Sequence, residues 1–342
     1  MKWMGRAFLT LLISIVMVAL TGWGTLAIYY SNVPGEGLRK IIALAFAFFG
    51  AALLVWYLVS SKRVLPLLVF FAAFLLLVAW WSTTPALQDR DWAPEYARLP
   101  HATINGDLVT IHNIRNFEYR TETDFTPRYY DKTFDLRQLD SVDVIASYWM
   151  GDAIAHTIIS FGFSGKDFLA ISIETRRERH ESYSSIAGFF KQYELFYVVA
   201  DERDLIRLRT NYRKDPPEDV YLYRTVAPPA NARRIFLDYI REINALADKP
   251  EFYNSLTTNC TTSILTHTRV NPDHLPLSWK VLLSGYVPAY LYEHRRIDTS
   301  LPFEELKRRS HINAVAQAAD NEQDFSQRIR AGLPTPPKLP SS

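Results

Sequence analysis

Long apolar stretches distinguish the first 81 residues from the rest of the chain. They span Phe8–Tyr29, Ile41–Val59 and Val64–Trp81, and none contains a charged residue. Each is about as long as the 17–25 residues with which a helix crosses a hydrocarbon core. A cleaved signal peptide is the alternative for the first stretch, but its length and the lack of a small-residue cleavage site favour an anchor. Residues 1–81 are therefore predicted to form a three-span membrane anchor.

Basic residues around these stretches predict how the anchor is oriented. With the N-terminus inside, four basic residues lie in the cytoplasm: Lys2, Arg6, Lys62 and Arg63. The loop Ser31–Lys40 then lies outside and carries two basic residues and one acidic residue. Because cytoplasmic loops are enriched in Lys and Arg, a cytoplasmic N-terminus is favoured. Residues 82–342 are then expected in the periplasm of a bacterium, attached to a multi-pass segment of the inner membrane.

Beyond residue 81 the pattern changes to short alternating segments separated by polar turns. Residues 82–107 are predicted as a linker and domain entry, 108–310 as the folded domain, and 311–342 as a polar, proline-rich tail with a disordered end. Strands are predicted at Leu108–Ile114, Phe117–Arg120, Val142–Trp149, Ile154–Phe163, Phe168–Thr175, Leu195–Ala200 and Asp219–Val226. Helices are predicted at Ser184–Gln192, Ala230–Ala247 and Thr261–Thr268. The domain is thus expected to be α+β with a mostly antiparallel sheet.

Charge and cysteine content exclude several classes of protein. After position 81 the chain has 32 basic and 35 acidic residues, so no nucleic-acid partner is expected. One cysteine excludes an intramolecular disulfide framework and any multi-cysteine metal site. The phosphate-binding, dinucleotide-binding and HExxH motifs are absent, and no two histidines have helical ligand spacing. No metal and no cofactor are therefore expected.

Cys260 is the first candidate for chemistry. It lies in the hydroxyl-rich segment TTNCTT, where a loop is expected to enter a helix. A lone cysteine is most often a small buried apolar residue, but here the neighbours are polar. A thiol at a helix N-terminus meets unpaired N–H groups and the positive end of the dipole, which should lower its pKa. Cys260 is therefore a candidate nucleophile, with Asn259 and Thr261 as candidates for orienting groups or for stabilising an oxyanion.

A cysteine nucleophile needs a base, and His156 is the best candidate. It lies on a predicted strand between Ala155 and Thr157, and the alternative is a histidine held in the core by a hydrogen bond. A hairpin turn near Ser164–Gly165 would bring Glu174 opposite His156 on the next strand. Glu174 is therefore the candidate that orients the imidazole, although a solvated strand end is an equally good interpretation.

Several segments also resemble a known family. They are RNFEYR, DFTPRYYDKTFDL, SYWMGDAIAHTIISFGF, SYSSIAGFFKQYELFYVVADERD, EDVYLYR, LTTNCTT and SGYVPAYLYEHRRIDTSLPFEELK. Over residues 110–310 the chain resembles the DUF4105 family, also described as the Lnb N-terminal periplasmic domain. The resemblance implies a circularly permuted papain-like, or NlpC/P60-like, fold with the histidine strand ahead of the nucleophile helix. It places Cys260 at the nucleophile position and His156 at the base position.

The resemblance and the residues together give a functional expectation. The best-known activity of that family moves an acyl chain within a bacterial lipoprotein to the amine of its N-terminal cysteine. Members carry a membrane region after the domain, whereas here the apolar stretches precede it. We expect a membrane-anchored cysteine acyltransferase or acyl hydrolase that uses a thioester acyl-enzyme, with lipid or lipoprotein acyl chains as partners. The alternatives are an amide hydrolase acting on the cell envelope, such as on peptidoglycan, and a non-catalytic envelope scaffold; the oligomeric state is left open.

Overall fold

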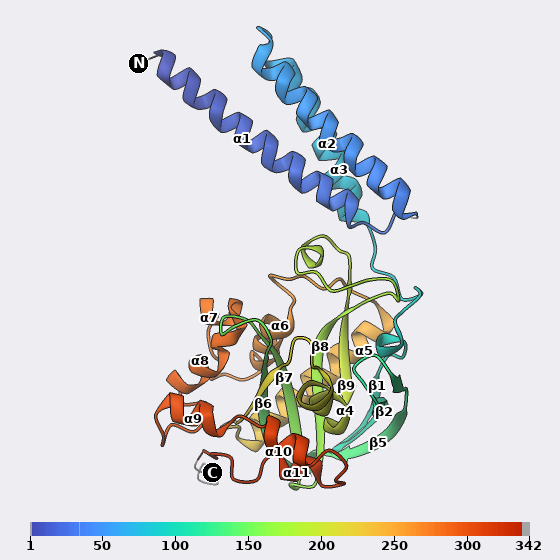
Figure 1. The fold of residues 1–342 in the computed structure, drawn as a ribbon, viewed down its shortest axis with the longest axis vertical. Coiled ribbons are helices and arrows are strands. Elements are labelled where there is room, and N and C mark those ends of the chain that lie inside the picture. The colour runs from blue at the N-terminus through green and yellow to red at the C-terminus, as the bar shows by residue number, and fades with distance from the viewer. Residues whose placement is uncertain (1, 34, 337–342) are drawn as a thin grey trace. The chain divides into compact units, whose positions relative to one another are not determined.

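The computed structural model describes residues 2–33 and 35–336 and divides into two compact units (Figure 1). The helical unit comprises residues 1–87, 183–194 and 251–254. The sheet unit comprises residues 88–182, 195–250 and 255–342. The chain thus leaves the sheet unit twice, for the short segments 183–194 and 251–254.

Three long helices form most of the helical unit: α1 (Lys2–Tyr29), α2 (Glu36–Val59) and α3 (Val64–Thr83). Each is long and apolar enough to cross a membrane, judged by length and composition. Met17, Leu53 and Phe70 pack together between the helices. Gly50 lets α2 approach Thr21 of α1 closely, because a Cβ at this position would collide with the Thr21 side chain.

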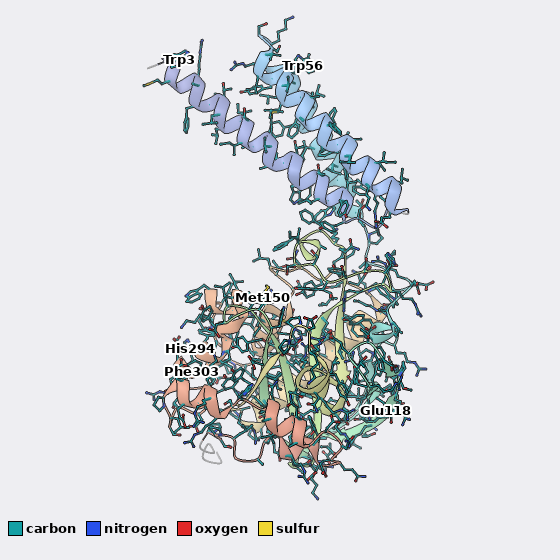
Figure 2. All side chains as sticks on the ribbon, in the orientation of Figure 1. Trp3, Trp56, Glu118, Met150, His294 and Phe303 are labelled. Carbon is teal, nitrogen blue, oxygen red and sulfur yellow. The ribbon has the colours of Figure 1, made fainter. Side chains whose placement is uncertain are left out.

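Aromatic residues are found at both ends of this unit. Figure 2 shows Trp3 and Trp56 at the end that carries the N-terminus. At the other end Trp23 packs edge-to-face against Trp81, with ring centroids 5.3 Å apart. Such belts are typical of helices that meet both membrane–water interfaces.

The sheet unit is built on an eight-stranded mixed sheet (Figure 1). Seven strands follow the order β1-β2-β9-β8-β7-β6-β10, and β5 pairs with β2. Their bounds are β1 His101–Asn105, β2 Leu108–Arg115, β5 Tyr129–Asp135, β6 Leu139–Tyr148, β7 Ala155–Phe163, β8 Asp167–Arg176, β9 Glu194–Ala200 and β10 Asp219–Arg224. A small separate sheet pairs β3 (Glu118–Tyr119) with β4 (Phe125–Thr126).

Helices cover both faces of this sheet. They are α4 Glu202–Arg207, α5 Pro229–Asp248, α6 Cys260–Thr268, α7 Trp279–Leu282, α8 Val287–Glu293, α9 Phe303–Arg309, α10 Asn313–Ala318 and α11 Phe325–Arg328. Because side chains alternate along a strand, β7 directs Phe161 to one face, where it meets Phe236 of α5. It directs Ile158 to the opposite face, in a buried cluster with residues of α4, α10 and α11.

Most of the predicted elements are present, but the sheet is not purely antiparallel. β2 and β9 run parallel through the pair Arg115↔Ala200, whereas the pairs β1–β2, β2–β5, β6–β7, β7–β8 and β6–β10 are antiparallel, so the sheet is mixed and mostly antiparallel, as expected. The parallel pairing joins strands that are distant in sequence, and neither strand's own alternation indicates its partner. The fold class is therefore mixed α/β with three long apolar helices.

Three segments differ from the sequence prediction. The helix predicted at Ser184–Gln192 is wrong, because only the 3₁₀ turn Ala187–Phe189 forms there. The stretch 82–107 contains strand β1 and the buried residue Tyr96, which are more than a linker. The tail contains α10 and α11 and buries Phe325, because apolar side chains in it complete the core. The disorder expected at the chain end falls on residues 337–342, outside the described residues.

Candidate active site

His156 lies near the start of β7, and its ring is held from the neighbouring strand. The β7–β8 ladder runs from Phe163↔Asp167 to Ile158↔Ser172, and two further residues in this register bring His156 opposite Glu174. Nε2 of His156 lies 2.6 Å from Oγ of Ser172, and that hydroxyl donates to Oε1 of Glu174 over 2.9 Å. Nε2 also lies 3.6 Å from the same carboxylate oxygen. The structure thus brings together the two residues that the sequence placed opposite each other.

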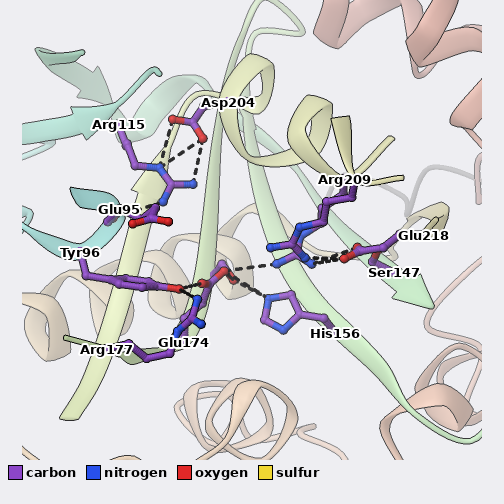
Figure 3. Close-up of polar contacts among 12 residues, drawn as sticks. Glu95, Tyr96, Arg115, Ser147, His156, Glu174, Arg177, Asp204, Arg209 and Glu218 are labelled. Carbon is purple, nitrogen blue, oxygen red and sulfur yellow. Dashed lines mark hydrogen bonds and ion pairs between the residues drawn. The ribbon is translucent and has the colours of Figure 1, made fainter. Parts of the chain in front are cut away.

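Glu174 is the centre of a buried polar network (Figure 3). Nη2 of Arg209 donates to Oε1 of Glu174 over 3.3 Å, and the Tyr96 hydroxyl donates to Oε2 over 3.4 Å. Figure 3 shows the side chains of His156, Arg209 and Tyr96 directed at this one carboxylate. The carboxylate is therefore fixed in position from three sides.

Arg209 joins this network to a second carboxylate. It lies in η4 (Leu208–Tyr212), a π-helical turn that directly follows α4. Its Nη1 donates to Oε2 of Glu218 over 3.0 Å, and Ser147 also donates to Glu218. π-helical turns are rare and are often found at functional sites.

Burial and charge set the ionisation of the pair. Burial lowers the pKa of His156 to about 3, with the Arg209 guanidinium acting in the same direction. Burial alone would raise the pKa of Glu174, but the surrounding cationic groups, including Arg209, outweigh this and lower it. At neutral pH the imidazole is therefore uncharged and able to accept a proton, while Glu174 is ionised.

Cys260 is the first residue of α6, and Asn259 caps this helix. Oδ1 of Asn259 accepts hydrogen bonds from the N–H groups of Thr261 and Thr262, each over 2.9 Å, and from the Thr261 hydroxyl. The N–H of Asn259 in turn donates to Oγ1 of Thr262, which completes a capping box. Nδ2 of Asn259 donates to the carbonyl of Ser255. Asn259 and Thr261 thus hold the helix start, and the first N–H groups of the helix are already paired.

The Cys260 side chain is half-buried, and its thiol is neutral. The expected lowering of its pKa is wrong: burial raises the pKa of Cys260, and the Thr157 N–H and the Thr261 hydroxyl offset this only in part. The Thr157 backbone acts on the thiol as a hydrogen-bond donor, so the thiol lies beside the residue that follows His156.

Within the described chain, no hydrogen bond joins Cys260 to His156. Nε2 of the ring is engaged by Ser172, and Nδ1 has no hydrogen-bond partner among the described residues. Nδ1 is thus the ring atom left for a proton transfer. The structure thus places the thiol of Cys260, on α6, beside the backbone of Thr157 on β7, the residue after His156, without a direct bond between the two side chains.

The sheet unit also contains an apolar cavity of about 160 Å³. Thr157 and Thr261, the residues that follow the candidate base and the candidate nucleophile, both line it. The rest of the wall is mainly aliphatic and aromatic, from β6, β7, α5, α6 and the segment around α7 and α8. Thr157 and Tyr239, which both line this cavity, each have a buried hydroxyl with no hydrogen-bond partner among the described residues. The cavity therefore suits an apolar chain that carries a few polar atoms.

One group of side chains has the composition of a metal site. Ligand atoms of Glu178, His180 and Glu181 lie within 4.8 Å of one another. However, Nη2 of Arg90 lies 2.9 Å from the Glu178 carboxylate and 3.6 Å from that of Glu181. A cation thus already occupies the position that a metal ion would take.

Sequence reasoning missed Ser172, Arg209 and Glu218. Ser172 had a detectable signal, since it lies two residues before Glu174 and strand alternation puts both on one face. Arg209 and Glu218 lie outside both strands of the hairpin, and nothing local in the sequence connects them to His156.

The comparison with family models gives one match. Residues 125–285 match the model of the Lnb N-terminal periplasmic domain, so the match includes His156, Glu174 and Cys260. Neither the comparison with curated proteins nor that with solved structures gave a significant match. The match and the three long apolar helices support a membrane-anchored protein with a periplasmic domain of Lnb-like family.

Proposed function

We propose that the periplasmic domain is a cysteine acyltransferase or acyl hydrolase that acts on acyl chains of lipids or lipoproteins. The observation that carries this proposal is the apolar cavity of about 160 Å³, whose lining includes Thr157 and Thr261, the sequence neighbours of His156 and Cys260. The side chains of His156 and Cys260 are not part of this lining. A cavity with this lining excludes water and accepts an acyl chain better than a peptide. A membrane anchor in the same chain keeps the site close to such substrates.

The ionisation of the site is against a preformed ion pair, so in this proposal the thiol proton moves during the attack itself. Cys260 and His156 are both neutral at rest, because burial raises the thiol pKa and lowers the imidazole pKa. As Sγ attacks the acyl carbonyl, Nδ1 of His156 takes the thiol proton, and the ionised Glu174 stabilises the imidazolium that forms. The imidazolium then protonates the leaving oxygen or nitrogen, which leaves a thioester on Cys260.

The second half of the reaction reverses these roles. An amine or a water molecule attacks the thioester carbonyl and gives its proton to His156, and the thiol is restored when that proton returns to sulfur. The oxyanion needs an N–H donor that is not already paired. The N–H of Cys260 donates to no acceptor among the described residues, whereas the N–H groups of Thr261 and Thr262 both donate to Oδ1 of Asn259. The Cys260 N–H therefore takes the oxyanion role that the sequence suggested for Asn259 and Thr261.

The order of the elements supports the finer family assignment. The histidine strand β7 precedes the nucleophile helix α6 in the chain, as expected for a circularly permuted papain-like fold of the DUF4105 type. Nε2 of His156 is directed at Ser172 and Glu174, and Nδ1 remains for the nucleophile. This division of the two ring nitrogens is what a Cys–His–acid arrangement needs.

Trapping the acyl-enzyme tests the proposal. The full chain is incubated in vesicles that contain a phospholipid, or a diacylated lipoprotein, with an alkyne-tagged acyl chain. We expect a tagged protein band that hydroxylamine removes, because the intermediate is a thioester. Cys260→Ala and His156→Ala should abolish the band. His112→Ala is the matched control, since His112 lies on β2, where it pairs with Asp131, and it should keep the band.

A non-catalytic scaffold is the second candidate function. The observation in its favour is that the described residues show no hydrogen bond between Cys260 and His156, together with a thiol whose pKa is raised by burial. The trapping experiment decides between the two. No thioester on the folded wild-type chain with either donor would favour the scaffold.

A further inference from the structure

The segment Tyr183–Glu194, which leads from β8 to β9, belongs to the helical unit and not to the sheet unit. It contains one short 3₁₀ turn, Ala187–Phe189. The proposed chemistry does not involve it. Its contacts within the helical unit show what surrounds it.

Lys191 and Phe190 attach this segment to one end of the three helices. Nζ of Lys191 donates to the carbonyl of Trp81 over 3.0 Å and lies 4.5 Å from the centre of that residue's ring. It thereby satisfies a carbonyl at the C-terminus of α3, where a cation is favourable. The Phe190 ring stacks on Tyr30 with centroids 5.9 Å apart and also contacts Trp23. The segment therefore lies at the aromatic end of the helices that contains Trp23 and Trp81.

Buried side chains recur at every third position of the segment, and so do exposed apolar ones. One face is buried within the protein and consists of Ala187, Phe190 and Tyr193. The other face is formed by Tyr183, Ile186 and Phe189, which are 51%, 55% and 42% exposed. Three large apolar side chains exposed within one short segment mark an interaction surface.

We propose that Tyr183, Ile186 and Phe189 form an interfacial loop that inserts into the headgroup region of the bilayer crossed by the helices. The loop is packed on the ends of helices that are long and apolar enough to span a membrane, at their aromatic belt, so its exposed side chains continue the surface that meets the bilayer. Aromatic and aliphatic side chains at this depth are partly buried in the headgroup and acyl boundary. The partner of this surface is therefore lipid.

The loop continues from β8, which carries Ser172 and Glu174, and the second excursion, Glu251–Asn254, ends five residues before Asn259. Lipid contact at residues 183–189 does not require Cys260 to be active. It can therefore be tested separately from the proposed catalysis.

The test places an environment-sensitive dye on the loop of the full chain in lipid nanodiscs. Cys260→Ala removes the native thiol, and Ile186→Cys supplies one labelling position. Val315→Cys is the matched control, because Val315 is an exposed aliphatic residue on α10 of the sheet unit. We expect the dye at position 186 to be quenched by nitroxide lipids labelled near the headgroup and to be several-fold less accessible to iodide than the dye at 315.

A further variant separates burial in lipid from burial in protein. Phe189→Glu in the Ile186→Cys background should raise iodide access and lower nitroxide quenching, because a charge is costly at that depth. Its circular dichroism should remain unchanged, since Phe189 faces outward. Equal iodide access at positions 186 and 315, or no quenching by nitroxide lipids at position 186, would overturn the proposal. Protection from iodide without nitroxide quenching would mean that protein covers the loop, which also contradicts the proposal.

Discussion

At the scale of single residues, the side chains of the site differ in whether their hydrogen-bonding groups already have partners. Asn259 has both ends of its carboxamide engaged, one by the helix start and one by the Ser255 carbonyl. Thr157 Oγ1 and Tyr239 OH, in contrast, are buried and have no hydrogen-bond partner among the described residues. A buried unpaired hydroxyl costs about 1–3 kcal/mol, so such groups usually meet a water molecule or a ligand. The residues suited to bind a substrate are therefore those that the fold leaves unsatisfied.

The raised pKa of Cys260 gives the first prediction at this scale. A raised pKa keeps the thiol neutral to higher pH, and only the thiolate reacts with iodoacetamide. Alkylation of the folded chain at pH 7 should therefore be several-fold slower than that of the urea-unfolded chain. The rate should rise at a higher pH than it does for the unfolded chain. Because the chain has one cysteine, mass spectrometry reports this residue alone.

His156→Ala provides the control for that measurement. At neutral pH the imidazole is uncharged, so its removal should leave the titration of the resting thiol nearly unchanged. A wild-type thiol that reaches its full alkylation rate below the pH at which the unfolded chain does so would contradict the prediction. It would mean that an ion pair forms before substrate binds.

At the scale of elements, the start of α6 depends on one side chain. Oδ1 of Asn259 accepts from the N–H groups of Thr261 and Thr262 at the beginning of a helix of nine residues. Asn259→Ala should lower the free energy of unfolding by about 1 kcal/mol, as is typical when an N-cap is lost. Asn259→Asp is the matched variant: its carboxylate keeps the cap, and only the hydrogen bond to Ser255 is lost. Thermal unfolding of the two variants beside the wild type measures the difference, and equal stability of the Ala variant and the wild type would disprove the capping role.

The same scale shows what the sequence could predict. Alternation and turn signals were sufficient for β7, β8 and their register, and therefore for the approach of His156 to Glu174. Periodicity of 3.6 was sufficient for α5, while it gave a false helix at Ser184–Gln192, where the buried positions recur every three residues. The parallel pairing of β2 with β9 depends on contacts between distant segments, which no local pattern encodes. The same holds for the hydrogen bond from Arg209 to Glu174. The direction of the Cys260 pKa shift was also beyond the sequence, because burial in the folded chain raises that pKa.

At the scale of the whole molecule, basic residues are concentrated at one end of the helical unit. Arg63 at the start of α3 donates to Thr10 of α1 over 2.8 Å, so Arg6, Lys62 and Arg63 lie near the same end of the helices. The opposite end carries the aromatic pair Trp23 and Trp81. Since membrane insertion retains basic ends in the cytoplasm, this distribution predicts a cytoplasmic N-terminus and a periplasmic sheet unit.

Labelling with a membrane-impermeant maleimide tests this orientation in spheroplasts of cells that express the full chain. In a Cys260→Ala background, Asp152→Cys reports the sheet unit and Ser61→Cys reports the loop between α2 and α3, and both native side chains are exposed. The first variant should be labelled in intact spheroplasts, and the second only after the membrane is permeabilised, because the basic pair that follows Ser61 keeps its loop in the cytoplasm. The two variants serve as controls for each other, since each must react once the membrane is opened. Labelling of Ser61→Cys but not of Asp152→Cys in intact spheroplasts would reverse the orientation and remove the periplasmic substrates on which the proposed acyl transfer depends.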